Sequence, residues 1–144
     1  MKKVALTLLA IIFLAGCAEL DKAKYGKGNP TEQDAQSCHF GEYPNNYQQI
    51  IKDYCEGILK DPGAAIYKFD PKLEKGVFKT KNIRVCGYLV KVQINGKNSY
   101  GGYTGFQDWV FVIENGRVGQ YAHLEVEGDF SGYDYWRYHW LAAE

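Results

Sequence analysis

The chain offers few residue patterns that could support catalysis. Cys86 is a potential nucleophile, but a thiol becomes reactive only when a nearby base or cation favours the thiolate, and no histidine lies near it in the sequence. Three carboxylates between residues 125 and 129 follow His123, but they come at the predicted end of a strand, where charged side chains usually face solvent. The sequence contains no zincin, Cys-x-x-Cys, serine-hydrolase or phosphate-loop motif. We therefore expect no enzyme activity, no bound metal and no cofactor.

Residues 96–106 are the first candidate for recognition. They combine four glycines with three aromatic residues and several hydrogen-bonding side chains. Tyrosine offers a large contact area at low entropic cost, and glycine lets a partner's backbone or sugar ring come close. The structural alternative, which we favour, is that the glycines permit a tight crossover and the aromatic rings cover a sheet edge. The candidate binding residues are Asn98, Ser99, Tyr100, Tyr103, Thr104 and Phe106.

Residues 128–144 are rich in aromatic side chains. Six fall within eleven positions: Phe130, Tyr133, Tyr135, Trp136, Tyr138 and Trp140. We expect this segment to fold back and close the open face of a sheet, because so much aromatic surface is rarely left in water. Two alternatives stay open, namely docking of a protein partner and contact with a bilayer interface. The candidate docking residues are Tyr135, Trp136, Arg137, Tyr138 and Trp140.

The N-terminus has the three-part layout of a secretory signal peptide: two lysines, an apolar run over residues 4–14, and small residues before Cys17. The apolar run is too short to span a bilayer, which takes about 20 residues. Leu14-Ala15-Gly16-Cys17 resembles the lipobox of bacterial lipoproteins, in which the cysteine sulfur carries a diacylglyceryl group and the signal is cut just before it. The resemblance implies a signal peptide over residues 1–16 and lipidation of Cys17. Because Ala18 rather than aspartate follows, it also implies the outer membrane, with the domain in the periplasm or at the cell surface.

Without residues 1–16 the chain keeps about 128 residues, enough for one domain with a core. The whole chain has 17 basic and 17 acidic side chains, and loss of Lys2 and Lys3 leaves a slight acidic excess. We see no basic cluster in the sequence, so neither nucleic acid nor anionic lipid headgroups are expected partners. The expected partners are membrane lipid, through acylated Cys17, and a protein of the envelope or of a phage.

Residues 17–36 are polar and lack an apolar period, which predicts a flexible tether between the lipid and the domain. In the oxidising periplasm, the three remaining cysteines allow one disulfide and one free thiol. We predict a bond between Cys38 and Cys55, because Cys38 precedes the predicted helix, Cys55 lies inside it, and the bond would attach the tether to the fold. Cys86 would then be a free, buried thiol in an apolar strand.

An amphipathic helix is predicted from Tyr47 to Leu59, where apolar residues recur at helical spacing after the N-cap candidate Asn46. The β-prone runs that follow are 65–69, 76–80, 84–94, 107–113 and 117–123. Asn115-Gly116 suits the turn of a hairpin. The predicted fold is α+β, with the helix packed on an antiparallel sheet of four to five strands in two layers. The domain is expected over residues 37–127, with the aromatic segment after it.

Three short motifs in this domain are similar to a pattern in small uncharacterised bacterial and phage-encoded proteins. The motifs are Asp61-Pro62-Gly63, Val85-Cys86-Gly87, and the run Lys97-Asn98-Ser99-Tyr100-Gly101-Gly102-Tyr103-Thr104-Gly105-Phe106. The likeness covers about residues 47–115 and implies a shared fold without an assigned activity. The strand between the last two motifs is longer and more apolar here than in the pattern.

These features together predict an outer-membrane-anchored lipoprotein that works by binding rather than by catalysis. Its role would be that of an accessory to an envelope assembly, or of a protective protein that excludes a toxin or a phage. The alternatives are a module that binds glycan or peptidoglycan and a small cell-wall hydrolase. A hydrolase is disfavoured because residues 96–106 contain no pair of carboxylates.

Overall fold

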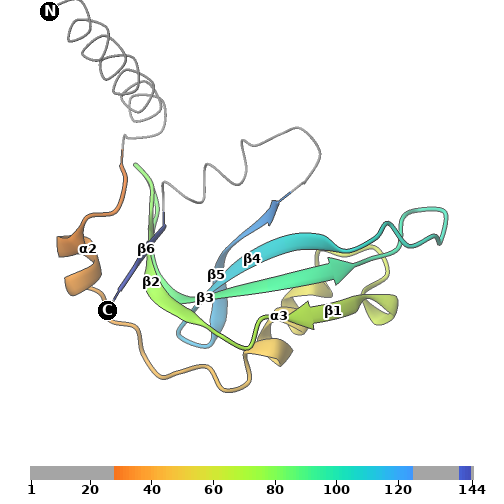
Figure 1. The fold of residues 1–144 in the computed structure, drawn as a ribbon, viewed down its shortest axis with the longest axis horizontal. Coiled ribbons are helices and arrows are strands. Elements are labelled where there is room, and N and C mark those ends of the chain that lie inside the picture. The colour runs from red at the N-terminus through yellow and green to blue at the C-terminus, as the bar shows by residue number, and fades with distance from the viewer. Residues whose placement is uncertain (1–27, 125–139, 144) are drawn as a thin grey trace, which may run out of the picture.

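Two short helices and six antiparallel strands make up the part of the chain that the computed structural model describes, residues 28–124 and 140–143 (Figure 1). The helices are α2 (Glu32–Gln36) and α3 (Tyr47–Cys55), and a 3-10 turn, η1, spans Pro62–Ala64. The strands are β1 (Ile66–Phe69), β2 (Glu74–Lys79), β3 (Arg84–Asn95), β4 (Gln107–Glu114), β5 (Arg117–Leu124) and β6 (Trp140–Ala142). This is the predicted α+β class. Within the described ranges, no helix has the length and apolar character needed to cross a membrane.

β3 is the longest strand and organises the sheet. One edge of β3 pairs with β4, which in turn pairs with β5. The other edge pairs with β2 near the start of β3 and with β1 near its end, and β6 adds outside β2. The predicted hairpin is present: Asn115 and Gly116 have φ angles of 50° and 75° and join β4 to β5. Positive φ at both central positions matches the right-handed twist of the flanking strands.

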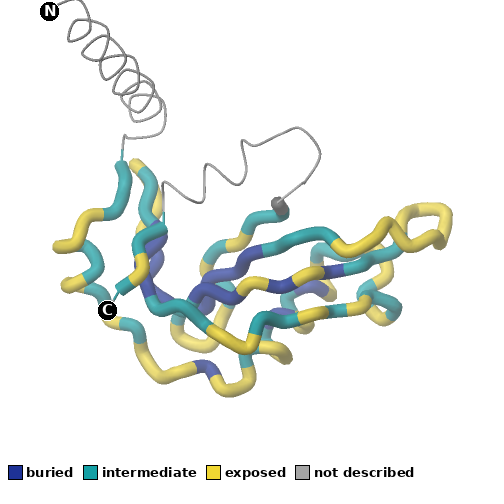
Figure 2. Tube along the Cα trace, in the orientation of Figure 1, coloured by how far each residue is buried: buried dark blue, intermediate teal, exposed yellow. Residues whose placement is uncertain are grey.

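Alternation along β3 divides the apolar core between the two faces of the sheet. On one face, Val90 and Ile94 pack with Ile51 and Cys55, which α3 presents one turn apart. On the other face, side chains from β2, β3 and β4 form a second cluster around the fully buried Phe78. Figure 2 shows that buried positions concentrate in the central strands, while the connection after β3 is exposed. Most buried apolar side chains therefore belong to one of two clusters that share the strand β3, and Val77 and Cys86 lie outside both clusters.

The chain before α3 is fixed to the sheet earlier than the sequence predicts. Lys79 Nζ donates to both carboxylate oxygens of Asp34 at 2.8 Å, and Arg84 Nε lies 3.7 Å from the same carboxylate. Arg84 also donates to the carbonyl oxygen of Asp34 at 3.0 Å and to Ser37 Oγ at 2.6 Å. Thr31 and Asp34 form a reciprocal capping box that starts α2. The prediction of a flexible tether is thus wrong for residues 32–36, which form a helix held by ion pairs to β2 and β3.

The predicted disulfide between Cys38 and Cys55 is wrong. Cys38 is bonded to Cys86 of β3, with an S–S distance of 2.08 Å, and Cys55 is a buried free thiol. The reason is the orientation of α3, which turns Cys55 into the core beside Val90 and away from the segment that follows α2. Burial raises the pKa of the Cys55 thiol to about 11, so the thiol stays protonated and unreactive. The same bond shows that the prediction of a free thiol at Cys86 is wrong.

Thiol mapping tests this pairing. Under native conditions we expect Cys55 to resist alkylation because it is fully buried, and to react only after denaturation without reductant. Non-reducing peptide mapping should recover a peptide with Cys38 linked to Cys86. Replacing both bonded cysteines with serine should lower the free energy of unfolding by about 2–5 kcal/mol. Recovery of a peptide with Cys38 linked to Cys55 would contradict the structure.

The ion pair of Asp34 makes stability depend on pH. The Lys79 ammonium, followed by the Thr31 hydroxyl and backbone N–H, holds the pKa of Asp34 well below its usual range. Since the pKa is lower in the folded state than the unfolded value of about 3.9, ionised Asp34 stabilises the fold above that value, and the contribution is lost as the pH falls through the folded-state pKa. We expect Asp34→Asn to lower the urea midpoint at neutral pH and to have less effect below about pH 3. In a protein that also carries Lys79→Met, the effect of Asp34→Asn on the urea midpoint should depend less on pH.

Candidate functional site

Four exposed apolar or aromatic side chains gather where β1 begins and the β3–β4 connection projects. They are Ile66, Tyr100, Tyr103 and Phe106, which we call the distal patch, and their exposed fractions are 45%, 97%, 49% and 39%. Ile66 is paired with the last residue of β3, so the start of β1 lies beside the base of this connection. The patch lies at the end of the long axis farthest from residue 28 (Figure 1). Exposed apolar groups that gather in this way are typical of interaction sites.

The tip of the connection is closed by hydrogen bonds around one asparagine. Asn98 Oδ1 accepts from the backbone N–H groups of Tyr100 at 3.0 Å and Gly102 at 3.1 Å. The backbone N–H of Asn98 donates to the Gly102 carbonyl oxygen at 2.8 Å, and Gly101 has a φ angle of 81° that suits glycine. These bonds hold the tip in one shape, with the ring of Tyr100 almost fully in solvent.

The base of the connection is attached to η1 and to the segment before it. The Tyr103 hydroxyl donates to the Ala64 carbonyl oxygen at 2.9 Å, and the Lys60 ammonium donates to the hydroxyl of Ser99. The Thr104 hydroxyl donates to the Gly96 carbonyl oxygen at 3.3 Å. The polar side chains that could have contacted a ligand are therefore engaged within the loop. Among the residues that the structure describes, the Tyr100 side chain makes no comparable contact and is exposed to a partner.

Lysine side chains border the distal patch. Lys68 Nζ lies 3.8 Å from the centre of the Phe106 ring, and Lys97 Nζ lies 5.4 Å from the centre of the Tyr103 ring. Cation–π contacts at exposed positions contribute about 0.5–1 kcal/mol each. Asp61 balances only part of this charge, at 3.6 Å from Lys97 Nζ. The border of the patch is thus mainly positive.

A second group of aromatic rings packs between α3 and β5. The Trp109 and His123 rings stack at 4.3 Å between centroids, and Tyr54 of α3 meets Tyr121 edge-on at 5.3 Å. Burial raises the pKa of the Tyr54 hydroxyl, with smaller contributions from Tyr121 and Cys55. These rings chiefly contact one another across the strands, as expected for a structural layer. Within the described ranges, no three acidic, histidine or cysteine side chains lie close enough to hold a metal ion.

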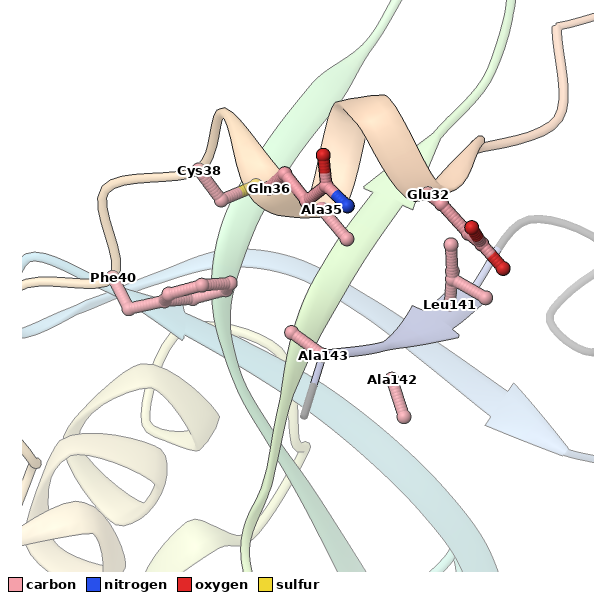
Figure 3. Close-up of a pocket in the computed structure, with 8 residues that line it drawn as sticks. All are labelled: Glu32, Ala35, Gln36, Cys38, Phe40, Leu141, Ala142 and Ala143. Carbon is pink, nitrogen blue, oxygen red and sulfur yellow. The ribbon is translucent and has the colours of Figure 1, made fainter.

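A shallow groove of about 620 Å³ lies between α2 and β6 (Figure 3). Glu32 and Gln36 line it from α2, Leu141 and Ala142 line it from β6, and Phe40 closes one end. Its lining holds one carboxylate and no second titratable side chain. The groove therefore lacks an acid/base pair and is a weaker candidate than the distal patch.

Only part of the predicted C-terminal docking segment is described. Tyr135, Trp136, Arg137 and Tyr138 lie outside the described residues, as do Cys17 and the carboxylates that follow His123. Trp140 belongs to β6, opposite Phe78 of β2, and packs on the second core cluster. Its indole lies against Gly76, where a Cβ atom would come within 2.5 Å of the ring. Trp140 thus extends the sheet at its edge and is partly buried there.

Ile66 and the lysines that border the patch are not evident as site residues from the sequence. Ile66 and Lys68 are distant from the loop in the sequence, and they reach it because β1 pairs with the last residues of β3. The available signal was the alternation of β1, which places both side chains on the face away from α3. The sequence alone does not show that β1 pairs with the end of β3. The alternation therefore does not predict that Ile66 and Lys68 lie beside the β3–β4 connection.

Comparison with known proteins gave no match to a family model, to a curated protein or to a solved structure. The resemblance to small bacterial and phage-encoded proteins therefore stays a prediction.

Substitutions in the loop should distinguish Asn98, which stabilises the shape of the loop, from Tyr100, which the loop exposes to solvent. We expect Tyr100→Ala to change the free energy of unfolding by less than about 0.5 kcal/mol, because the side chain is 97% exposed. Asn98→Ala removes the acceptor of two backbone N–H groups and should cost about 1–2 kcal/mol. Chemical denaturation measures both values. A large loss with Tyr100→Ala would show that this ring supports the fold after all.

Proposed function

We propose that the protein is an outer-membrane-anchored lipoprotein, attached through acylated Cys17, that acts by binding a protein partner rather than by catalysis. The observation that supports this proposal most directly is the distal patch, with Tyr100 exposed at the tip of a loop whose shape is fixed by its own hydrogen bonds. Tyrosine is enriched among the residues that contribute most to protein binding. A loop that is ordered before binding also loses less conformational entropy when the complex forms.

The contacts of the loop favour a protein partner over a glycan. Sugar recognition needs hydrogen-bonding side chains directed at the ligand, but Asn98, Ser99 and Thr104 already bond within the loop or to Lys60. What the patch offers instead is apolar and aromatic surface bordered by lysine, which suits the side chains of another protein. Among the described residues of this region, Asp61 stands beside Lys97 rather than beside a second carboxylate, which gives no support to a hydrolase.

The shape of the patch suggests how such a protein would act. A projecting loop with an aromatic tip needs a concave surface on its partner, as long antibody loops do when they enter clefts. Insertion of this kind suits an accessory that occupies a cleft in an envelope assembly. It equally suits a protective protein that blocks a toxin or an incoming phage protein. Both roles require binding without turnover.

Crosslinking in intact host cells tests the proposal. We expect the wild-type protein to capture one envelope or phage protein, and the double variant Tyr100→Ala/Phe106→Ala to lose it. With the purified pair, the dissociation constant should rise by at least about tenfold, because a central aromatic anchor contributes about 2 kcal/mol. Tyr43→Ala is the matched control, since Tyr43 is 47% exposed and lies outside the patch.

Two results would contradict a protein-binding role for the patch. Equal capture by the wild type and the double variant would exclude the patch as the binding surface. Sedimentation of the wild-type protein with purified peptidoglycan, lost in the double variant, would instead support the glycan-binding alternative. Because Tyr100 is exposed, loss of binding should occur without a comparable loss of stability, and a melting curve for each variant checks this.

A further inference from the structure

The described chain begins against the turn between β2 and β3. Gly28 packs so tightly there that a Cβ atom would lie 2.4 Å from the backbone nitrogen of Lys81, and its φ angle of +95° also favours glycine. Residues 1–27 therefore join the domain at this turn, which is near the start of the coloured ribbon in Figure 1. Only the stretch from Cys17 to Gly28 separates the predicted lipid from the turn, and a chain of that length cannot reach beyond about 40 Å.

The turn itself, residues 80–83, has a fixed shape and an exposed apolar side chain. The backbone N–H of Thr80 donates to the carbonyl oxygen of Ile83 at 2.7 Å, and the N–H of Ile83 donates to Thr80 Oγ1 at 3.1 Å. Ile83 is 41% exposed despite this order. An exposed apolar side chain on a turn of fixed shape is available for insertion at a membrane interface.

Basic side chains lie in this turn and at the strand ends beside it. Lys81 is exposed in the turn, and Lys79 and Arg84 flank it at the ends of β2 and β3. Asp34 binds both of these flanking cations, and Glu32 lies two residues before Asp34 in α2. The cations therefore exceed the carboxylates, although the sequence shows no basic run. Folding assembles the group from α2, β2 and β3.

We propose that the β2–β3 turn contacts the anionic lipid surface in which Cys17 is anchored. Ile83 enters the headgroup region, and the exposed Lys81 meets the lipid phosphates. A basic side chain near an anionic membrane contributes about 1 kcal/mol, and a buried apolar side chain adds to this. The proposal rests on the lipid anchoring of Cys17 that belongs to the proposed function. It adds a second membrane contact, which would direct the distal patch away from the lipid.

The test uses the mature, acylated protein in vesicles. Ile83→Cys and Tyr100→Cys are each labelled with an environment-sensitive nitrobenzoxadiazole dye, and Cys55 does not compete because it is buried. In vesicles with about 30% phosphatidylglycerol, we expect a blue-shifted emission and severalfold weaker iodide quenching at position 83. The dye at position 100 should stay fully accessible to iodide. In vesicles of phosphatidylcholine alone, the effect at position 83 should weaken.

Charge reversal provides the matched control. Lys81→Glu should abolish most of the protection at position 83, whereas Lys72→Glu, at an exposed lysine between β1 and β2, should leave it unchanged. An acylated protein whose position 83 is as accessible as position 100 would overturn the lipid contact and leave the anchoring intact. A protein without the acyl group by mass spectrometry, which does not float with vesicles, would overturn both. Protection at position 83 that persists without anionic lipid and depends on a bound protein would assign the turn to that protein.

Discussion

The Cys38–Cys86 disulfide fixes the segment that follows α2 to the central strand, and the way the described chain enters the sheet depends on this bond. It closes a loop of 48 residues that contains α3, β1 and β2. Closing a loop of that size removes unfolded-state entropy worth about 3–4 kcal/mol, a large share of the stability of a small domain. The ion pairs of Asp34 act beside it and hold α2 against β2 and β3. The chain consequently leaves the domain at one defined place.

β3 carries the second constraint, because it contributes to both core layers and pairs with three other strands. Its alternation sets which side chains face α3 and which face the cluster around Phe78. Gly87 lies where β3 meets β4 so closely that a Cβ atom would come within 2.2 Å of the Ile113 carbonyl oxygen. Any side chain there would separate the strands. A strand that is shared in this way connects the disulfide at one end to the projecting loop at the other.

Local sequence patterns predicted α3 and the strands β1 to β5 well, but they missed α2 and β6 and predicted the long-range contacts poorly. The helix, the Asn115-Gly116 hairpin and the antiparallel sheet follow from period and turn chemistry, which act over a few residues. The helix ends at Cys55 rather than at Leu59, since Gly57 weakens its last turn. The disulfide and the place of Ile66 in the patch depend on which strands become neighbours. No single segment of the sequence shows which strands become neighbours. The prediction therefore paired Cys38 with the nearer Cys55 instead of with Cys86.

The separation between the β2–β3 turn and the distal patch affects how the patch can bind a partner. If both proposals hold, the turn at residues 80–83 restricts the rotation of the domain on its anchor, and the distal patch samples a narrow range of directions. For a partner in the same membrane, such restriction raises the effective concentration of the patch when the geometry matches and abolishes simultaneous contact when it does not. A domain on a long flexible tether would be less selective. The ordered attachment of α2 to the sheet therefore favours a partner at a limited height above the lipid, because α2 begins at Glu32, 15 residues after the predicted anchor Cys17.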